Sequence, residues 1–130
     1  MRAVDTNVIV RLVSADNFRQ AQVAETFVAR GAWVSMPVIA ETVWVLGGVY
    51  GFDRQRIAAA VDMLLGTQDL SIQDAGVVAS ALDLFRSKPS VSFSDCLILE
   101  LARKAGHLPL GTFDRDLGKL DGAEYLKAAS

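Results

Sequence analysis

The first twelve residues, Met1-Arg-Ala-Val-Asp-Thr-Asn-Val-Ile-Val-Arg-Leu12, decide how the chain begins to fold. A short apolar entry leads directly into Asp5-Thr6-Asn7, and a second apolar run follows at once. Asp, Thr and Asn are residue types that cap helix N-termini, so this pattern predicts a buried strand before Asp5 and a helix from Asn7 or Val8. Open α/β sheets bind ligands beyond the carboxyl ends of their strands, which makes Asp5 a candidate site residue.

The rest of the sequence alternates short apolar segments with helical patterns, typical of an α/β fold. Further strands are predicted at 32–36, 70–72, 108–113 and 124–126, and helices at 18–30, 37–46, 54–65, 75–87, from 92 or 94 to about 105, and 114–120. Four aromatic residues, Trp33, Trp44, Phe85 and Phe93, are expected in the core. No linker or repeat is visible, so we expect one domain over residues 1–130, a three-layer α/β/α sandwich around a small, mainly parallel sheet.

Composition narrows the function classes. With 52% apolar and 22% charged residues, the chain is expected to fold into a packed core. The net charge of −2 argues against nucleic-acid binding through bulk charge but leaves room for a local basic rim. One cysteine, Cys96, excludes an internal disulfide and fits a reducing compartment. Without a signal peptide or an apolar run of about 18 residues, a cytoplasmic protein with no membrane partner is expected.

Four acidic residues stand isolated in apolar surroundings: Asp5, Glu41, Asp95 and Asp114. Each lies at or near a predicted helix N-terminus, and a buried carboxylate needs a partner or a metal. Simple helix capping remains an alternative for Asp5 and for Asp95. It does not explain Glu41, which falls a full turn inside the helix after Pro37.

A shared cation would resolve the repulsion between clustered carboxylates. Mg²⁺ and Mn²⁺ prefer oxygen ligands, and such ions activate water and stabilise charge on phosphoryl oxygens. Zinc is disfavoured, because the chain has a single cysteine and a single histidine, His107, and they are not at ligand spacing.

The segments around these acids resemble the successive motifs of PIN-domain ribonucleases, in particular the VapC-type toxins of prokaryotic toxin–antitoxin pairs. The matching segments are Val4-Asp5-Thr6-Asn7-Val8-Ile9-Val10, Ile39-Ala40-Glu41, Phe93-Ser94-Asp95 and Thr112-Phe113-Asp114-Arg115-Asp116-Leu117. They cover essentially the whole chain, in order. Leu117 departs from the pattern, since an aromatic residue is common there in the VapC subgroup.

The resemblance implies a PIN-like sandwich in which Asp5, Glu41, Asp95 and Asp114 are catalytic and bind Mg²⁺ or Mn²⁺, with Asp116 as a secondary ligand. It also implies that Thr6, Asn7 and Thr112 hydrogen-bond the acids or a metal-bound water. Arg11 and Arg115 are candidates for RNA phosphate contacts. The implied activity is metal-dependent hydrolysis of RNA by a VapBC-type toxin, a homodimer inhibited by a VapB-type antitoxin.

Two other functions are alternatives to this one. A PIN-fold module that binds RNA or a partner without nuclease turnover remains open, because motifs do not report turnover. A haloacid-dehalogenase-like phosphatase is disfavoured, since that chemistry requires a second acid two residues after the nucleophilic Asp, and Asn7 occupies that position.

Overall fold

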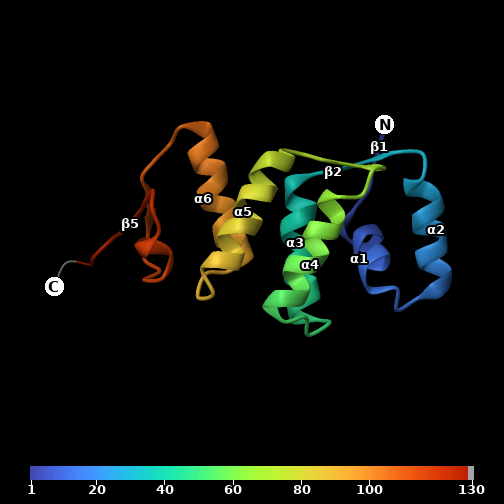
Figure 1. Ribbon diagram of the computed structural model, residues 1–130, viewed down its shortest axis with the longest axis horizontal. Coiled ribbons are helices and arrows are strands. Elements are labelled where there is room, and N and C mark those ends of the chain that lie inside the picture. The colour runs from blue at the N-terminus through green and yellow to red at the C-terminus, as the bar shows by residue number, and fades with distance from the viewer. Residues whose placement is uncertain (129–130) are drawn as a thin grey trace. The chain divides into compact units, whose positions relative to one another are not determined.

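The computed structural model describes residues 1–128 and has an α/β fold with six α-helices, as the sequence predicts (Figure 1). All strand pairs in these residues are parallel. The strands fall into two sheets, and the chain divides into two compact units, Met1–Ala75 and Gly76–Ser130. Each unit is described by itself below. The expectation of a single domain over residues 1–130 stays a prediction.

The first unit contains a three-stranded sheet in the order β1-β2-β3. Its strands are β1 (Arg2–Ala3), β2 (Ala32–Val34) and β3 (Leu70–Ile72). In the register of the sheet, Ala3 pairs with Trp33, and Trp33 pairs with Ser71. Strand β1 is short because the chain enters a helix directly after Asp5.

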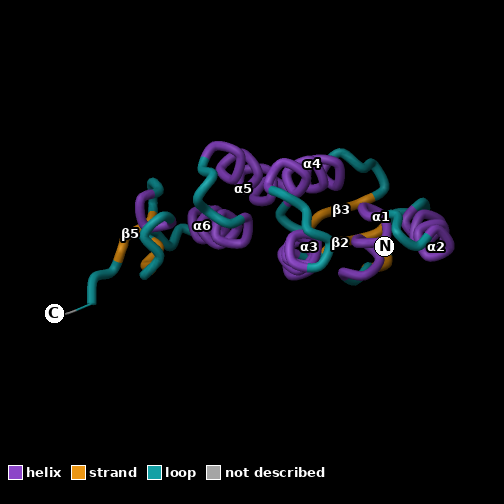
Figure 2. Tube along the Cα trace, turned by 90° about the horizontal axis from the view of Figure 1, so that it is seen from below, coloured by secondary structure: helices purple, strands orange, loops and turns teal. Residues whose placement is uncertain are grey.

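Four helices accompany this sheet, and Figure 2 shows its strands (orange) among them. They are α1 (Thr6–Ser14), α2 (Phe18–Val28), α3 (Met36–Gly48) and α4 (Arg54–Leu65), with the N-cap residues Asp5, Asn17, Ser35 and Asp53. Each cap side chain accepts a hydrogen bond from a backbone N–H of the first turn, which satisfies a donor with no partner inside the helix. The α4 bounds are those predicted from the sequence.

The carboxyl edge of this sheet gathers the segments that follow its strands. Strand β1 leads to Asp5, and β2 leads to Ser35 and the start of α3. After β3, the N–H of Gln73 donates to the carbonyl oxygen of Val34 at 2.8 Å, and its side-chain oxygen accepts from the N–H of Met36 at 2.8 Å. Asp5 and the N-terminus of α3 therefore lie at the same edge, where α/β proteins hold ligands.

The second unit consists of two helices and a two-stranded parallel sheet. Its elements are α5 (Ala75–Ser87), α6 (Phe93–Ala105), β4 (Leu110–Thr112), a 3₁₀ turn η1 (Leu117–Lys119) and β5 (Ala123–Tyr125). The rings of Phe85 and Phe93 meet edge to face, with centroids 5.6 Å apart. The strand predicted from residue 108 begins only at Leu110, because Pro109 has no N–H for strand pairing.

Core positions follow the periodicity of the helices, with two exceptions among the aromatic residues. Phe85 and Phe93 are buried as predicted, but Trp44 is 70% exposed and Trp33 is 39% exposed, so their core assignment is wrong. Helix α3 buries the face that contains Ile39, Val43 and Leu46, and Trp44 lies off that face. Trp33 projects from β2 opposite to its two buried neighbours.

Candidate active site

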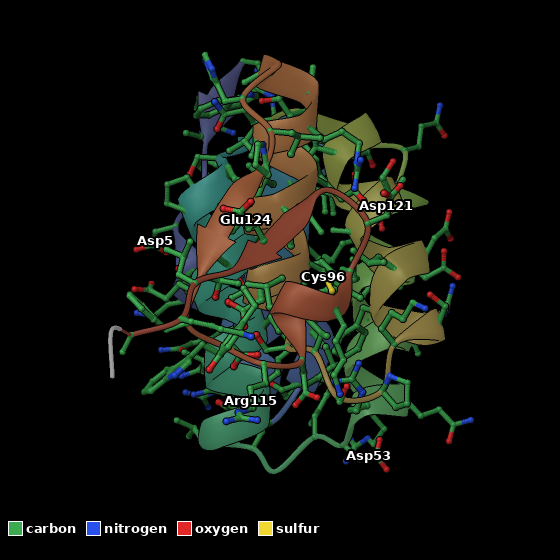
Figure 3. The ribbon with its side chains drawn as sticks, turned by 90° about the vertical axis from the view of Figure 1, so that its left-hand side faces the viewer. Asp5, Asp53, Cys96, Arg115, Asp121 and Glu124 are labelled. Carbon is green, nitrogen blue, oxygen red and sulfur yellow. The ribbon has the colours of Figure 1, made fainter. Side chains whose placement is uncertain are left out.

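Asp5 lies at the carboxyl end of β1 and caps α1. Its backbone is extended, with φ −98° and ψ −178°, and its Oδ1 accepts from the N–H of Val8 at 3.3 Å. The side chain is exposed although its neighbours in the sequence are apolar (Figure 3). The cap hydrogen bond is made by Oδ1 alone, so Oδ2 does not take part in capping. The cap and a metal-binding role are therefore compatible.

The two residues after Asp5 differ in their surroundings. Thr6 is buried at the start of α1, whereas Asn7 is exposed and lines a cavity of about 410 Å³ beside α2. Burial of a hydroxyl at this position makes Thr6 part of the packing that fixes the start of α1. The supporting role implied for both side chains toward a metal-bound water stays a prediction.

Glu41 projects from the exposed side of α3, so burial is not what constrains it either. Its neighbour Thr42 is only 1% exposed, and the Thr42 hydroxyl has no hydrogen-bond partner in the described part of the chain. A buried hydroxyl without a partner is unfavourable by about 1–3 kcal/mol. Helix α3 thus presents an exposed carboxylate next to a buried hydroxyl that has no hydrogen-bond partner in the described residues.

Asp95 sits in the first turn of α6, where the negative charge is favourable next to the helix N-terminus. The cap of this helix is Ser92, whose hydroxyl oxygen accepts from the N–H of Asp95 at 3.2 Å. The alternative that Asp95 itself caps the helix is therefore wrong. Its half-buried carboxylate is not the capping group and is left for another role.

Asp114 and Asp116 follow β4 and are both exposed. Asp114 Oδ1 accepts from the N–H of Leu117 at 2.8 Å, and its own N–H donates to the Thr112 hydroxyl oxygen at 3.0 Å. Thr112 therefore holds the backbone of Asp114. Asp116 precedes η1 and makes no side-chain cap bond there. Because Asp114 closes this tight turn, the short helix predicted at 114–120 is reduced to the 3₁₀ turn η1.

The candidate RNA contacts Arg11 and Arg115 are in different situations. The Arg11 guanidinium is 3.3 Å from Asp16 Oδ1 and 3.0 Å from the Tyr50 hydroxyl, so it is committed to structural contacts. The pKa of Asp16 is lowered by hydrogen bonds from the hydroxyls of Ser14 and Tyr50 and by the charge of Arg11. Arg115 is exposed, between two acids. A phosphate contact by either arginine stays a prediction.

The described structure places these acids in two groups. Asp5 and Glu41 belong to the first unit, whereas Asp95, Asp114 and Asp116 belong to the second. Within residues 1–128, no three His, Cys, Asp or Glu side chains form a group able to hold a metal ion. The metal site that combines acids of both groups stays a prediction.

The chemistry of the donor set fits a hard cation. Every candidate ligand is a carboxylate, the donor that Mg²⁺ and Mn²⁺ prefer. Cys96, next to Asp95, is fully buried (Figure 3), and His107 lies in an exposed loop, so neither supplies a soft ligand. The acids Asp5, Glu41, Asp95 and Asp114 are thus of the right type for the ion that the sequence predicts.

Two residues that shape the site were not recognised from the sequence. Gln73 fixes the N-terminus of α3 through its side chain. Gly118 allows η1 to pack on β5, because a Cβ at this position would lie 2.7 Å from the Cβ of Tyr125. A glycine inside the helix predicted at 114–120 was the available signal for a close approach.

Comparison with known families gives the class of the protein. The sequence model of the PIN domain matches residues 2–123, nearly the entire chain. The chain therefore belongs to the PIN domain family. No curated protein gives a significant match.

Among solved structures, the chain is similar to VapC20 of Mycobacterium tuberculosis, a sarcin-ricin loop cleaving toxin. The two are 23% identical over 91% of this chain and 93% of the other, with a TM-score of 0.43. This likeness is too weak to carry an argument about function. No helix in residues 1–128 is long and apolar enough to cross a membrane.

Proposed function

We propose that this PIN-domain protein is a Mg²⁺- or Mn²⁺-dependent endoribonuclease that hydrolyses RNA phosphodiester bonds. The observation that carries the proposal is the match of the PIN domain over residues 2–123, together with four isolated acids that follow the motif order of PIN ribonucleases. The parallel sheet of the first unit also places Asp5 at its carboxyl edge, the usual ligand-binding edge of such folds.

In this proposal, Asp5, Glu41, Asp95 and Asp114 bind the metal and Asp116 assists. The ion, when bound, supplies an activated water and offsets negative charge on the phosphate. The chain's own contribution is to hold the carboxylates in place. The Val8 N–H orients Asp5, and the Leu117 N–H orients Asp114.

The motif resemblance to VapC-type toxins supports a more specific role. We propose that the protein is the cytoplasmic toxin of a VapBC-type pair, acts as a homodimer and is inhibited by a cognate VapB-type antitoxin. We expect the protein to copurify with the product of a neighbouring antitoxin gene, and we expect that complex not to cleave RNA. Free cleavage by the copurified complex would contradict the toxin–antitoxin role.

The nuclease proposal is tested by cleavage of RNA with Mg²⁺ or Mn²⁺. Asp5→Asn and Asp95→Asn each remove one negative charge, and each is expected to abolish cleavage. Asp53→Asn is the matched control, because Asp53 caps α4 and Asn is an equally good cap. Equal cleavage by all variants would contradict the site. Absence of cleavage in every protein, with RNA binding retained, would favour a PIN-fold binding module.

A further inference from the structure

The first unit has a groove along α2 whose charged residues are all basic. A cavity of about 820 Å³, here called the arginine groove, is lined by Arg2, Arg19, Gln22, Val23, Thr26, Phe27 and Arg30. The cavity of about 410 Å³ beside α1 shares Arg19, Val23 and Phe27 with it and adds Arg11 to the lining. The two cavities therefore adjoin along the row that these three shared residues form on α2.

Its charge contrasts with that of the whole protein. The two cavities are lined by four arginines and by no acidic residue, whereas the chain carries a net charge of −2. The acidic residue of α2, Glu25, lines a separate cavity that also includes Asp69. Helix α2 thus separates its charges by face. A concave surface of one sign raises the local concentration of ligands of the opposite sign.

The arginines are arranged to receive an extended anion. The Arg2 guanidinium lies 3.7 Å from the centre of the Phe27 ring and donates to the Phe27 carbonyl oxygen at 3.5 Å, which fixes its orientation. Arg19 and Arg30 are exposed; Arg19 lies in the first turn of α2, and Arg30 lies two residues after its last residue, Val28.

The neighbouring cavity of about 410 Å³ extends toward the candidate active site. Its α1 end is lined by Asn7 and Val8, and the N–H of Val8 donates to the Asp5 carboxylate at 3.3 Å. Apolar side chains of Val8, Val23 and Phe27 provide a wall against which bases can lie. Arginine matches phosphate oxygens in a planar, two-pronged geometry.

We propose that the arginine groove binds the phosphate backbone of the single-stranded RNA that the enzyme cleaves, with Arg19 and Arg30 as its main contacts. This inference rests on the proposed ribonuclease function and names the surface that carries the substrate toward Asp5. Arg11 contributes less, because Asp16 already compensates its charge.

The test measures RNA affinity without cleavage. A fluorescent single-stranded oligoribonucleotide is titrated in EDTA with Asp5→Asn protein, alone and with Arg19→Gln/Arg30→Gln, over a series of salt concentrations. Removing two phosphate contacts should lower affinity roughly tenfold or more at low salt and reduce the slope of log K against log salt by about 1.4, at about 0.7 per contact. Circular dichroism checks that the variant is folded.

Arg56→Gln in the same background is the matched control. Arg56 is an exposed arginine of α4 that packs on Phe52 and lies outside both cavities, so affinity and slope should stay unchanged. Equal affinity and equal slope for the double variant and the control would overturn the proposal. So would tighter binding of poly-glutamate than of RNA through Arg19 and Arg30, because the groove would then serve an acidic protein.

Cleavage assays separate this proposal from the nuclease function. The protein could bind RNA through Arg19 and Arg30 and yet show no metal-dependent cleavage. This result would contradict the nuclease function and support the RNA-binding role of the arginine groove. The protein could instead cleave RNA with metal while its RNA affinity does not depend on either arginine. This result would contradict the RNA-binding role of the arginine groove and support the nuclease function.

Discussion

Asp5 has two roles that can be separated by substitution. Its carboxylate caps α1 through the N–H of Val8, and it is a proposed metal ligand. Asn accepts the same cap bond as Asp, so Asp5→Asn should change the free energy of unfolding by no more than about 0.5 kcal/mol. Asp5→Ala removes the cap bond and should destabilise the protein by about 1 kcal/mol.

Thermal unfolding followed by circular dichroism measures the structural role. For a domain of this size, 1 kcal/mol corresponds to a midpoint lowered by roughly 3–5 °C, which Asp5→Ala should show and Asp5→Asn should not. RNA cleavage with Mg²⁺ measures the chemical role. Loss of a charged ligand removes several kcal/mol of charge stabilisation, so both variants should lose at least about 100-fold in rate.

The combination of results decides between the roles. Asp5→Asn with wild-type stability and wild-type cleavage would refute the metal role and leave Asp5 as a helix cap alone. If cleavage fell only in Asp5→Ala, in step with its lower stability, the loss would reflect the cap and not the ligand. A metal-binding Asp5 requires that the Asp5→Asn protein be stable and inactive.

Three further predictions concern stability. Gly118→Ala should destabilise the protein by about 1–3 kcal/mol, because the new Cβ would lie 2.7 Å from that of Tyr125. Gly76→Ala is the control, since a Cβ there has no neighbour within 4 Å. Equal midpoints of urea unfolding for the two variants would contradict this packing. Ser92→Ala should lower the free energy of unfolding by about 1 kcal/mol and leave RNA cleavage unchanged, since it removes the α6 cap but no carboxylate. A loss of cleavage in the folded variant would contradict a purely capping role for Ser92. The lowered pKa of Asp16 stabilises the folded protein above the ordinary pKa of 3.8, and this stabilisation is lost as pH falls through the folded pKa. The urea midpoint of the wild type should therefore exceed that of Asp16→Asn near neutral pH, and the difference should disappear in acid. A constant difference across pH would exclude this origin.

Local signals in the sequence were sufficient for most of the fold. Asp53 before an apolar stripe predicted α4 at its observed bounds, and Gly106 marked the end of α6. These features depend on neighbouring residues alone, so the sequence contains them directly. The 3₁₀ turn at 117–119 did not follow, because Gly118 packs on Tyr125 and Asp114 closes the turn through its side chain.

The candidate site was predictable in its residues but not in their surroundings. Isolation among apolar neighbours singled out Asp5 and Glu41, yet both side chains are exposed. A helix has a solvent face even within an apolar segment, and Glu41 lies on that face of α3. The sequence also left the start of α6 open between residues 92 and 94, and the hydrogen bond from the Asp95 N–H identifies Ser92 as the cap.

Asp5, Asp95 and Asp114 are proposed to bind the same metal ion. Titration of the ¹⁵N-labelled protein with Mn²⁺ tests this proposal, because the paramagnetic ion broadens the NMR signals of nearby amides. If these acids share one ion, the amides of Val8, Asp95 and Leu117 broaden together at the same low Mn²⁺ concentration, and Asp5→Asn weakens the effect at all three. Broadening at only one of these amides, or at none, would contradict a shared metal site.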